Sequence, residues 1–322
     1  MAAYAARRLL QMIPLLIGVS FITFAIINLM PGSPADIVRN DPKLKPAARE
    51  MKIRQLGLDK PWPERYVIWL GNAAKGDLGV SMHNRVPVAS RIAAVLPNTL
   101  LLTTSALALA LLAAVPLGIT AALKHRTWFD RFANIGTVAM YSMPSFILAF
   151  ILVLIFSLKF NSWGWPSLPV GGMTDVRGGG GFWDRLEHLI LPTVSLALLS
   201  IGGWSAYIRS SMLETLQMDY VRTARSKGLR EKAVIYGHAL RNAVLPLITL
   251  VGLSLPGLFG GAVIIESIFA WPGIGRLTLE AVSRRDYTLI MGTTMMFAVL
   301  TMLSNLAADL AAGLLDPRIR QE

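Results

Sequence analysis

Residues 98–123 read NTLLLTTSALALALLAAVPLGITAAL, a stretch that contains no charged side chain. A bilayer core about 30 Å thick is crossed by about 20 helical residues, because each residue advances an α-helix by about 1.5 Å. The single proline is tolerated in a membrane helix, where neighbouring helices can bond the carbonyl that it frees. The stretch therefore predicts a helix that spans a membrane.

Five further apolar runs of similar length occur along the chain, and together they predict an all-α polytopic membrane protein with six transmembrane helices. The composition agrees, because 54% of the residues are hydrophobic and only 16% are charged, against about 25% charged in soluble domains. The predicted spans are Leu9–Met30, Asn98–Leu123, Phe132–Leu158, His188–Met212, Ala243–Ile265 and Leu289–Ala312.

The net charge of +12 is distributed between the apolar runs. With the N-terminus inside the cell, the inner segments hold more than twice as many Lys and Arg residues as the two short outer loops, which is the bias that sets membrane orientation. Both termini are therefore predicted to be cytoplasmic. Nucleic-acid binding is not favoured, because the basic residues do not gather on one soluble face.

These spans divide the chain into an N-terminus with the first helix (1–30), an outer loop (31–97), a five-helix core (98–312) and a cytoplasmic tail (313–322). The outer loop contains amphipathic stretches such as Ala47–Leu56, which predict a small cap or lateral helices without an active site. The chain has no cysteine, its four histidines are scattered, and it lacks a P-loop. We therefore expect neither a metal site nor nucleotide hydrolysis in this chain.

The most informative polar segment is Glu214–Pro246, with a cytoplasmic loop expected over 213–242. It predicts two short helices around Gly228, which is suited to the left-handed conformation that ends a helix, with Leu229 making the hydrophobic contact that often follows. Ala224 and Gly228 are four residues apart, so they fall on one face and predict a notch for another surface. The other interpretation is that the basic residues only hold the loop at anionic lipid; the notch favours docking.

The run YVRTARSKGL at residues 220–229, followed by HALRNAVLP at 238–246, resembles the coupling loop of ATP-binding-cassette importer permeases. The residues in these two runs resemble those of the B-type permease of the dipeptide, oligopeptide and nickel branch. Arg222 and Thr223 stand where the general family pattern has Glu and Ala, and Arg241 stands at its proline position, departures that the peptide branch shares. Further matches in chain order are RRLL at 7–10, Met30–Pro34, Leu56–Pro61, Gly76–Ser81, Pro97–Thr99, Glu266–Phe269, Trp271–Gly275, Arg285–Tyr287 and Leu315–Arg318.

The resemblance implies a non-catalytic permease subunit of a bacterial cytoplasmic membrane importer, in which this chain forms half of the translocation pathway for short peptides. It implies a second homologous permease subunit, two ATPase subunits that bind ATP and Mg, and an extracytoplasmic peptide-binding protein as partners. The chain itself would bind no cofactor and would contact lipid. The ATPase would be contacted through the 219–242 loop, with the coupling residues Tyr220, Arg222, Thr223, Ala224, Lys227, Gly228, Leu229 and Leu240.

Polar groups inside a membrane are costly, so those in the spans are candidates for the pathway or its gate. For several of them a structural role competes: Glu266 ends the fifth span, Asp309 lies near a helix end, and Arg209 is expected to extend its charge to the membrane surface. A pair such as Gly257 and Gly261 more often serves helix packing. The candidate pathway residues are Ser142, Ser205, Glu266, Asn305 and Asp309.

Other functions stay open at this point. Related permeases carry nickel or glutathione, so the cargo is not fixed by the resemblance. An autonomous secondary transporter would need ion-coupling groups near mid-membrane, and the predicted spans hold almost none. An intramembrane hydrolase would need facing catalytic side chains, which the positions of the four histidines disfavour.

Overall fold

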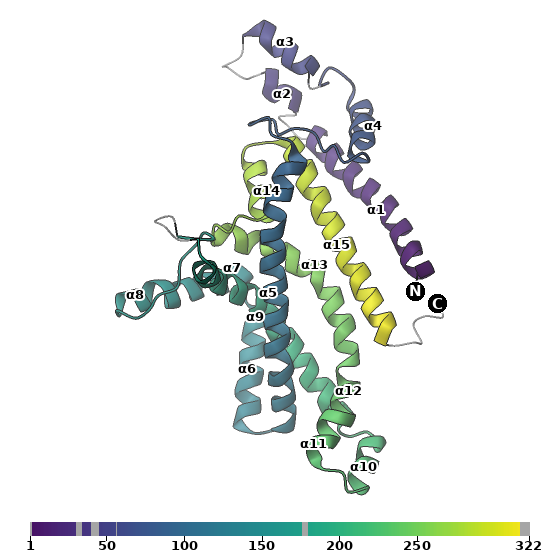
Figure 1. Cartoon of the computed structure of the whole chain (residues 1–322), viewed down its shortest axis with the longest axis vertical. Coiled ribbons are helices and arrows are strands. Elements are labelled where there is room, and N and C mark those ends of the chain that lie inside the picture. The colour runs from purple at the N-terminus through teal and green to yellow at the C-terminus, as the bar shows by residue number, and fades with distance from the viewer. Residues whose placement is uncertain (1, 30–33, 40–44, 56, 176–179, 316–322) are drawn as a thin grey trace. The chain divides into compact units, whose positions relative to one another are not determined.

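The computed structural model describes residues 2–29, 34–39, 45–55, 57–175 and 180–315 (Figure 1). Six helical segments within these residues are long and apolar enough to cross a membrane, which confirms the predicted all-α membrane fold. The helices that contain them are α1 (Ala2–Leu29), α5 (Val88–Leu123), the series α7 to α8 (Ser145–Ser162), α9 (Phe182–Thr215), α13 (Leu245–Ile268) and α15 (Tyr287–Leu315).

The third span begins later than predicted. The sequence predicts one helix over Phe132–Leu158, but α6 (Trp128–Ser142) ends before Met143, whose backbone is extended with ψ of 137°. Pro144 explains the break, because a proline ring disfavours the helical conformation of the residue before it. The apolar segment then consists of α7 (Ser145–Leu152), the π-helical η1 (Val153–Lys159) and α8 (Phe160–Ser162).

Several helices extend beyond their predicted apolar parts. Helix α5 begins at Val88 where the sequence predicts Asn98, and α9 begins at Phe182 where it predicts His188. Hydropathy detects only the part of a helix that suits lipid, whereas backbone hydrogen bonds continue into polar turns that water can solvate. The apolar pattern therefore does not predict where these helices begin.

The chain divides into two compact units. The first, called the core unit here, comprises the described residues of Asn98–Arg276 and Leu303–Glu322. The second, called the N-terminal unit, comprises those of Ala2–Pro97 and Leu277–Met302.

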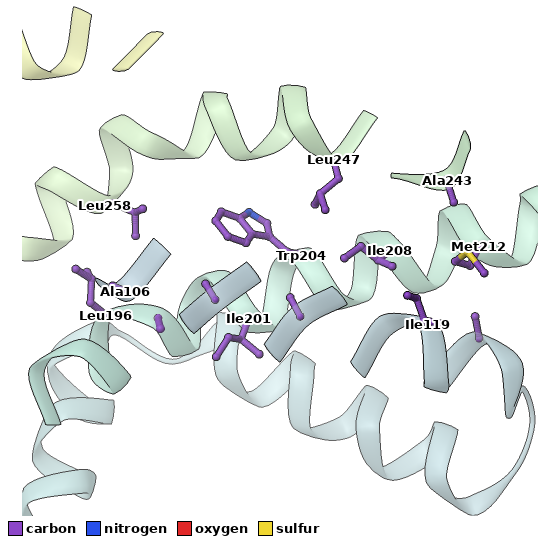
Figure 2. Close-up of a cluster of buried hydrophobic side chains, with 14 of the residues drawn as sticks. Ala106, Ile119, Leu196, Ile201, Trp204, Ile208, Met212, Ala243, Leu247 and Leu258 are labelled. Carbon is purple, nitrogen blue, oxygen red and sulfur yellow. The ribbon is translucent and has the colours of Figure 1, made fainter. Parts of the chain in front are cut away.

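In the core unit, α9 packs closely against both α5 and α6. A Cβ atom added to Gly118 of α5 would lie 2.7 Å from Ile208, and one added to Gly202 would lie 2.7 Å from the carbonyl oxygen of Thr137 in α6. Figure 2 shows Trp204, Ile208 and Met212 at helical spacing along α9, within this buried cluster. Small residues at the crossings thus let the helices pack closely. In lipid this close packing favours association, because the hydrophobic effect does not drive helices together there.

The N-terminal unit joins α1 to α4 (Trp62–Ala73) through aromatic side chains and a buried hydrogen bond. The ring of Tyr66 packs edge-on against Phe21, and its hydroxyl lies 2.9 Å from Ser20 Oγ. The segment between α1 and α4 also forms α2 (Pro34–Arg39) and α3 (Pro46–Gln55), and α3 corresponds to the predicted stretch Ala47–Leu56, of which Leu56 lies outside the described residues.

A buried carboxylate organises the start of α15 in the same unit. Asp286 accepts hydrogen bonds from the amides of Leu289 and Met82, at 3.2 Å and 3.1 Å, and from the hydroxyl of Ser81. The first of these is an N-cap of α15. The sequence matches at Gly76–Ser81 and Arg285–Tyr287 are therefore parts of one structural junction.

Candidate coupling site

The predicted hairpin between α9 and α13 is formed. Helix α10 (Asp219–Ser226) ends at Gly228, whose φ is +75° and whose amide donates to the carbonyl oxygen of Arg225 at 2.9 Å. A Cβ atom added to Gly228 would meet no described residue within 4 Å, so the backbone conformation and not space requires the glycine. The expected left-handed helix end is confirmed.

The turn is bridged by an ion pair. The side chain of Leu229 is 43% exposed, whereas Arg225 Nη2 lies 2.7 Å from Glu231 Oε1 across the turn. The hydrogen bond from Arg225 lowers the pKa of the Glu231 carboxyl group. Surface pairs of this kind stabilise little by themselves, and this one links the two arms of the hairpin across the turn.

The expected notch is wrong, because Ala224 is buried and Gly228 lies beyond the end of α10. Ala224 is 6% exposed and Val221 is fully buried, and both belong to the buried cluster that contains Val234 and Ile235 of η2 (Val234–Ala239). A small side chain at 224 lets α10 approach η2 closely. The outward surface of α10 is formed by the exposed side chains of Tyr220, Arg222, Thr223 and Lys227.

The second arm begins where predicted but does not continue directly into the fifth span. It starts with α11 (Glu231–Ala233) and passes through η2 to α12 (Leu240–Ala243), where the half-buried Leu240 packs against the core cluster. The helix is interrupted at Val244, because Pro246 in the first turn of α13 has no amide hydrogen to extend the hydrogen-bond ladder.

One hydrogen bond joins the two arms of the hairpin, and a second joins the hairpin to α9. Asn242 Nδ2 donates to the hydroxyl of Tyr220 at 3.0 Å, which joins the ends of α12 and α10. Ser211 Oγ donates to the carbonyl oxygen of Ala243 at 3.0 Å, and Figure 2 shows Ala243 beside the same part of α9. The hairpin is therefore a folded body connected to α9.

Arg209, which the sequence predicts to extend its charge to the membrane surface, forms an ion pair. Its Nε lies 2.5 Å from Asp130 Oδ1 and its Nη2 lies 2.8 Å from Asp130 Oδ2, while His125 Nδ1 lies 3.3 Å from the same carboxylate. The hydrogen bond from Arg209 lowers the pKa of Asp130 to about 2 although burial opposes this. The pair connects the start of α6, next to the α5–α6 turn, to α9. Arg209 lies near the end of α9 that leads into the hairpin.

The candidate pathway residues are not gathered on one open surface. Ser205 is buried and donates to the carbonyl oxygen of Gly202 in its own helix, at 3.2 Å, and Glu266 is fully buried. Ser142 and Asn305 are exposed on α6 and α15, and Asp309 is half-buried on α15. Ser205 and Glu266 thus have structural roles in this conformation.

Glu266 holds the loop that follows α13. Its carboxylate accepts from Thr99 Oγ1 at 2.7 Å and from the amide of Arg276 at 3.1 Å, while its carbonyl oxygen accepts from the amide of Trp271 at 2.8 Å. A Cβ atom added to Gly273 would overlap this carboxylate.

Asn98 and Thr99 hold the other side of that loop. The indole nitrogen of Trp271 donates to the carbonyl oxygen of Asn98 at 3.0 Å, and Asn98 Nδ2 donates to the carbonyl oxygen of Pro272 at 2.8 Å. Thr99 Oγ1 also accepts from the amide of Ile274 at 2.8 Å. Three separate sequence matches, at 97–99, 266–269 and 271–275, therefore form one buried clamp.

A hollow of about 470 Å³ lies between α9 and α13 in the core unit. Its polar lining is formed by hydroxyl groups, and the indole nitrogen of Trp204 donates to Ser254 Oγ at 3.4 Å. A Cβ atom added to Gly203 or Gly257 would meet nothing within 4 Å among the described residues, so Gly257 makes no close packing contact with them, whereas one added to Gly261 would lie 3.0 Å from Leu196. The lining residues are Leu196, Leu199, Ser200, Gly203, Trp204, Tyr207, Leu250, Ser254, Gly257, Leu258 and Gly261.

The hollow contains residues that the sequence did not assign to a pathway, Tyr207 and Ser254 among them. Ser200 carried a weak signal as a hydroxyl inside an apolar run. The opposition of α9 and α13 could not be inferred from spacing, because the two helices are separated by the whole coupling hairpin.

Comparison with known proteins places the chain among transport components. Residues 114–321 match the family described as binding-protein-dependent transport system inner membrane component, and residues 1–103 match the N-terminal family of such membrane components. The chain is 40% identical to the oligopeptide transport system permease protein AppB of Bacillus subtilis, over 99% of both chains. It is 36% identical to the dipeptide transport system permease protein DppB of Escherichia coli K12, over 100% of both.

A solved structure shares the fold. An inward-facing form of the MetNI methionine ABC transporter matches 70% of this chain and 96% of its own, with a TM-score of 0.55 and 14% sequence identity. At that identity the likeness concerns the arrangement of helices alone.

Proposed function

The chain belongs to the family of binding-protein-dependent transport system inner membrane components, and from this premise we propose that it is one of two permease subunits of an ATP-driven importer of short peptides. The observation that carries the proposal is the folded polar hairpin between α9 and α13, with its basic outward surface. The curated relatives compared above are permeases for peptides and match along the full chain, so nickel and glutathione are not proposed as cargo.

In this proposal the hairpin docks on a separate ATPase subunit. The partner ATPases bind ATP and Mg, and this chain binds no cofactor of its own. A displacement of the docked hairpin would reach α9 through the Ser211 contact, because a folded body moves as a unit and packed helices transmit the shift. The Arg209–Asp130 pair would carry the same movement to the α5–α6 turn.

The hollow between α9 and α13 is our candidate for this chain's half of the pathway, to be completed by a second homologous permease. None of the described lining residues of the hollow carries a charge, so the surface offers hydroxyl groups and small residues to peptides of varied side chains. An extracytoplasmic peptide-binding protein would then do the selecting. We place the complex in a bacterial cytoplasmic membrane with both termini of this chain in the cytoplasm.

Replacing Gly257 by tryptophan is expected to reduce peptide uptake at least tenfold in the reconstituted importer. The position is open within this chain, so the helix can accept the ring, which then fills the hollow. Uptake of a labelled dipeptide into proteoliposomes is compared with ATP hydrolysis by the same complex. Gly257→Ala is the control and should keep near-normal uptake; full uptake by the tryptophan variant in an assembled complex would exclude this hollow as the pathway.

A further inference from the structure

The N-terminal unit contains a cavity of about 480 Å³ that the proposed transport mechanism does not use. Its wall includes Phe24 and Asn28 of α1, Arg65 and Trp69 of α4, and Tyr287 at the start of α15. The volume falls in the range of about 300–1,000 Å³ that small-ligand sites occupy. The cavity is therefore large enough for a polar headgroup.

The lining of the cavity is positively charged. Arg54, Lys60 and Arg65 contribute to it, whereas the described lining residues include no Asp or Glu. Lys60 forms an exposed ion pair with Glu64 at 2.7 Å, a contact that water can readily replace. The charge balance of the wall thus favours an anion.

Arg65 lacks a carboxylate partner among the described residues. Its Nη2 donates to the neutral side-chain oxygen of Asn28 at 2.5 Å, and its buried Nε has no acceptor in the described part of the chain. The buried indole nitrogen of Trp69, in the same wall, has none either. Covering a charged group without a counter-charge is unfavourable, so a bound anion would stabilise this wall.

The cavity also adjoins the end of a membrane span. Phe24 and Asn28 lie in the last two turns of the candidate span Ala6–Leu29, of which only 11% of the most apolar window is buried within this chain. Tyr66 and Trp69 stack next to Phe24, an aromatic grouping typical of the membrane–water boundary. A ligand here would have its charge in the cavity and an apolar part along α1.

We propose that this cavity binds the headgroup of an anionic phospholipid, with the phosphate held by the basic residues Arg54, Lys60 and Arg65. The carboxylate of a peptide could satisfy the same cations. Only a lipid also uses the exposed apolar flank of α1, and we therefore assign the site to lipid.

The test is native mass spectrometry of the full chain in detergent, titrated with phosphatidylglycerol or phosphatidylcholine. Phosphatidylglycerol should bind preferentially, and Arg65→Gln should weaken it about tenfold, the loss expected from removing one charge-assisted contact. Lys75→Gln removes the same charge from an exposed position after α4 that does not line the cavity, and it should change nothing. Arg65→Lys should restore most of the binding.

Equal retention of both lipids, or unchanged binding of phosphatidylglycerol to Arg65→Gln, would overturn the proposal. Binding of a dipeptide that depends on Arg65 and displaces the lipid would overturn the assignment to lipid. Thermal unfolding of each variant without lipid shows whether it is folded. If Arg65→Gln is not, the double variant Arg54→Gln, Lys60→Gln must show the same selective loss. None of these outcomes bears on peptide transport itself.

Discussion

Replacing Gly228 by tryptophan is expected to abolish coupling, with peptide uptake reduced at least tenfold while the subunit stays folded and inserted. The φ of +75° places tryptophan and most other L-residues under strain of about 1 kcal/mol, and the ring adds bulk to an open turn next to the basic outward surface. The readout is dipeptide uptake and peptide-stimulated ATP hydrolysis in proteoliposomes that contain the whole complex.

Two substitutions at the same position separate backbone strain from bulk. Asparagine tolerates the left-handed conformation, so Gly228→Asn should transport nearly normally. Gly228→Ala carries the strain without the bulk and should be intermediate. Normal uptake by the tryptophan variant would show that no partner approaches this turn closely.

Replacing Glu266 by alanine is expected to destabilise the core unit by about 3 kcal/mol or more. The change leaves the hydroxyl of Thr99 and the amide of Arg276 without their buried acceptor, and each unsatisfied group costs about 1–3 kcal/mol. It also empties the space that the carboxylate occupies beside Gly273. Thermal unfolding in detergent and the yield of monodisperse protein measure the effect.

Glu266→Gln keeps one acceptor oxygen and should lose about half as much stability. Glu187→Ala is the matched control, because Glu187 is exposed near the start of α9, and its variant should unfold like the parent protein. A Glu266→Ala protein as stable as this control would show that the clamp contributes little to the fold. Loss of uptake without loss of stability would instead assign Glu266 to the pathway.

Apolar length was sufficient to predict the six spans, because the membrane requires about 20 apolar residues whatever the rest of the fold does. The helix end at Gly228 was equally predictable, since a glycine after a polar helix is a local signal. The third span shows the limit of the approach: apolar residues continue through Met143, but Pro144 interrupts the helix there.

The sequence-based predictions failed where they depended on contacts between different helices and loops. The spacing of Ala224 and Gly228 predicted one helix face, but α10 ends at Ser226, and Ala224 is buried whereas Gly228 is exposed. In the same way the sequence did not reveal that Arg209 pairs with Asp130, because Asp130 comes from another helix. The loop at Trp271–Gly275 meets Asn98 from far along the sequence, and a single sequence carries no signal for such a contact.

The central claim is that the hairpin between α9 and α13 lies in the cytoplasm and is covered by a motor subunit. The chain contains no cysteine, so Lys227→Cys provides a unique label on the exposed turn. A membrane-impermeant maleimide should label it in inside-out vesicles but not in intact cells or spheroplasts, and the assembled ATPase should slow the reaction at least tenfold. Labelling from the cell exterior, or equal rates with and without the ATPase, would contradict the account.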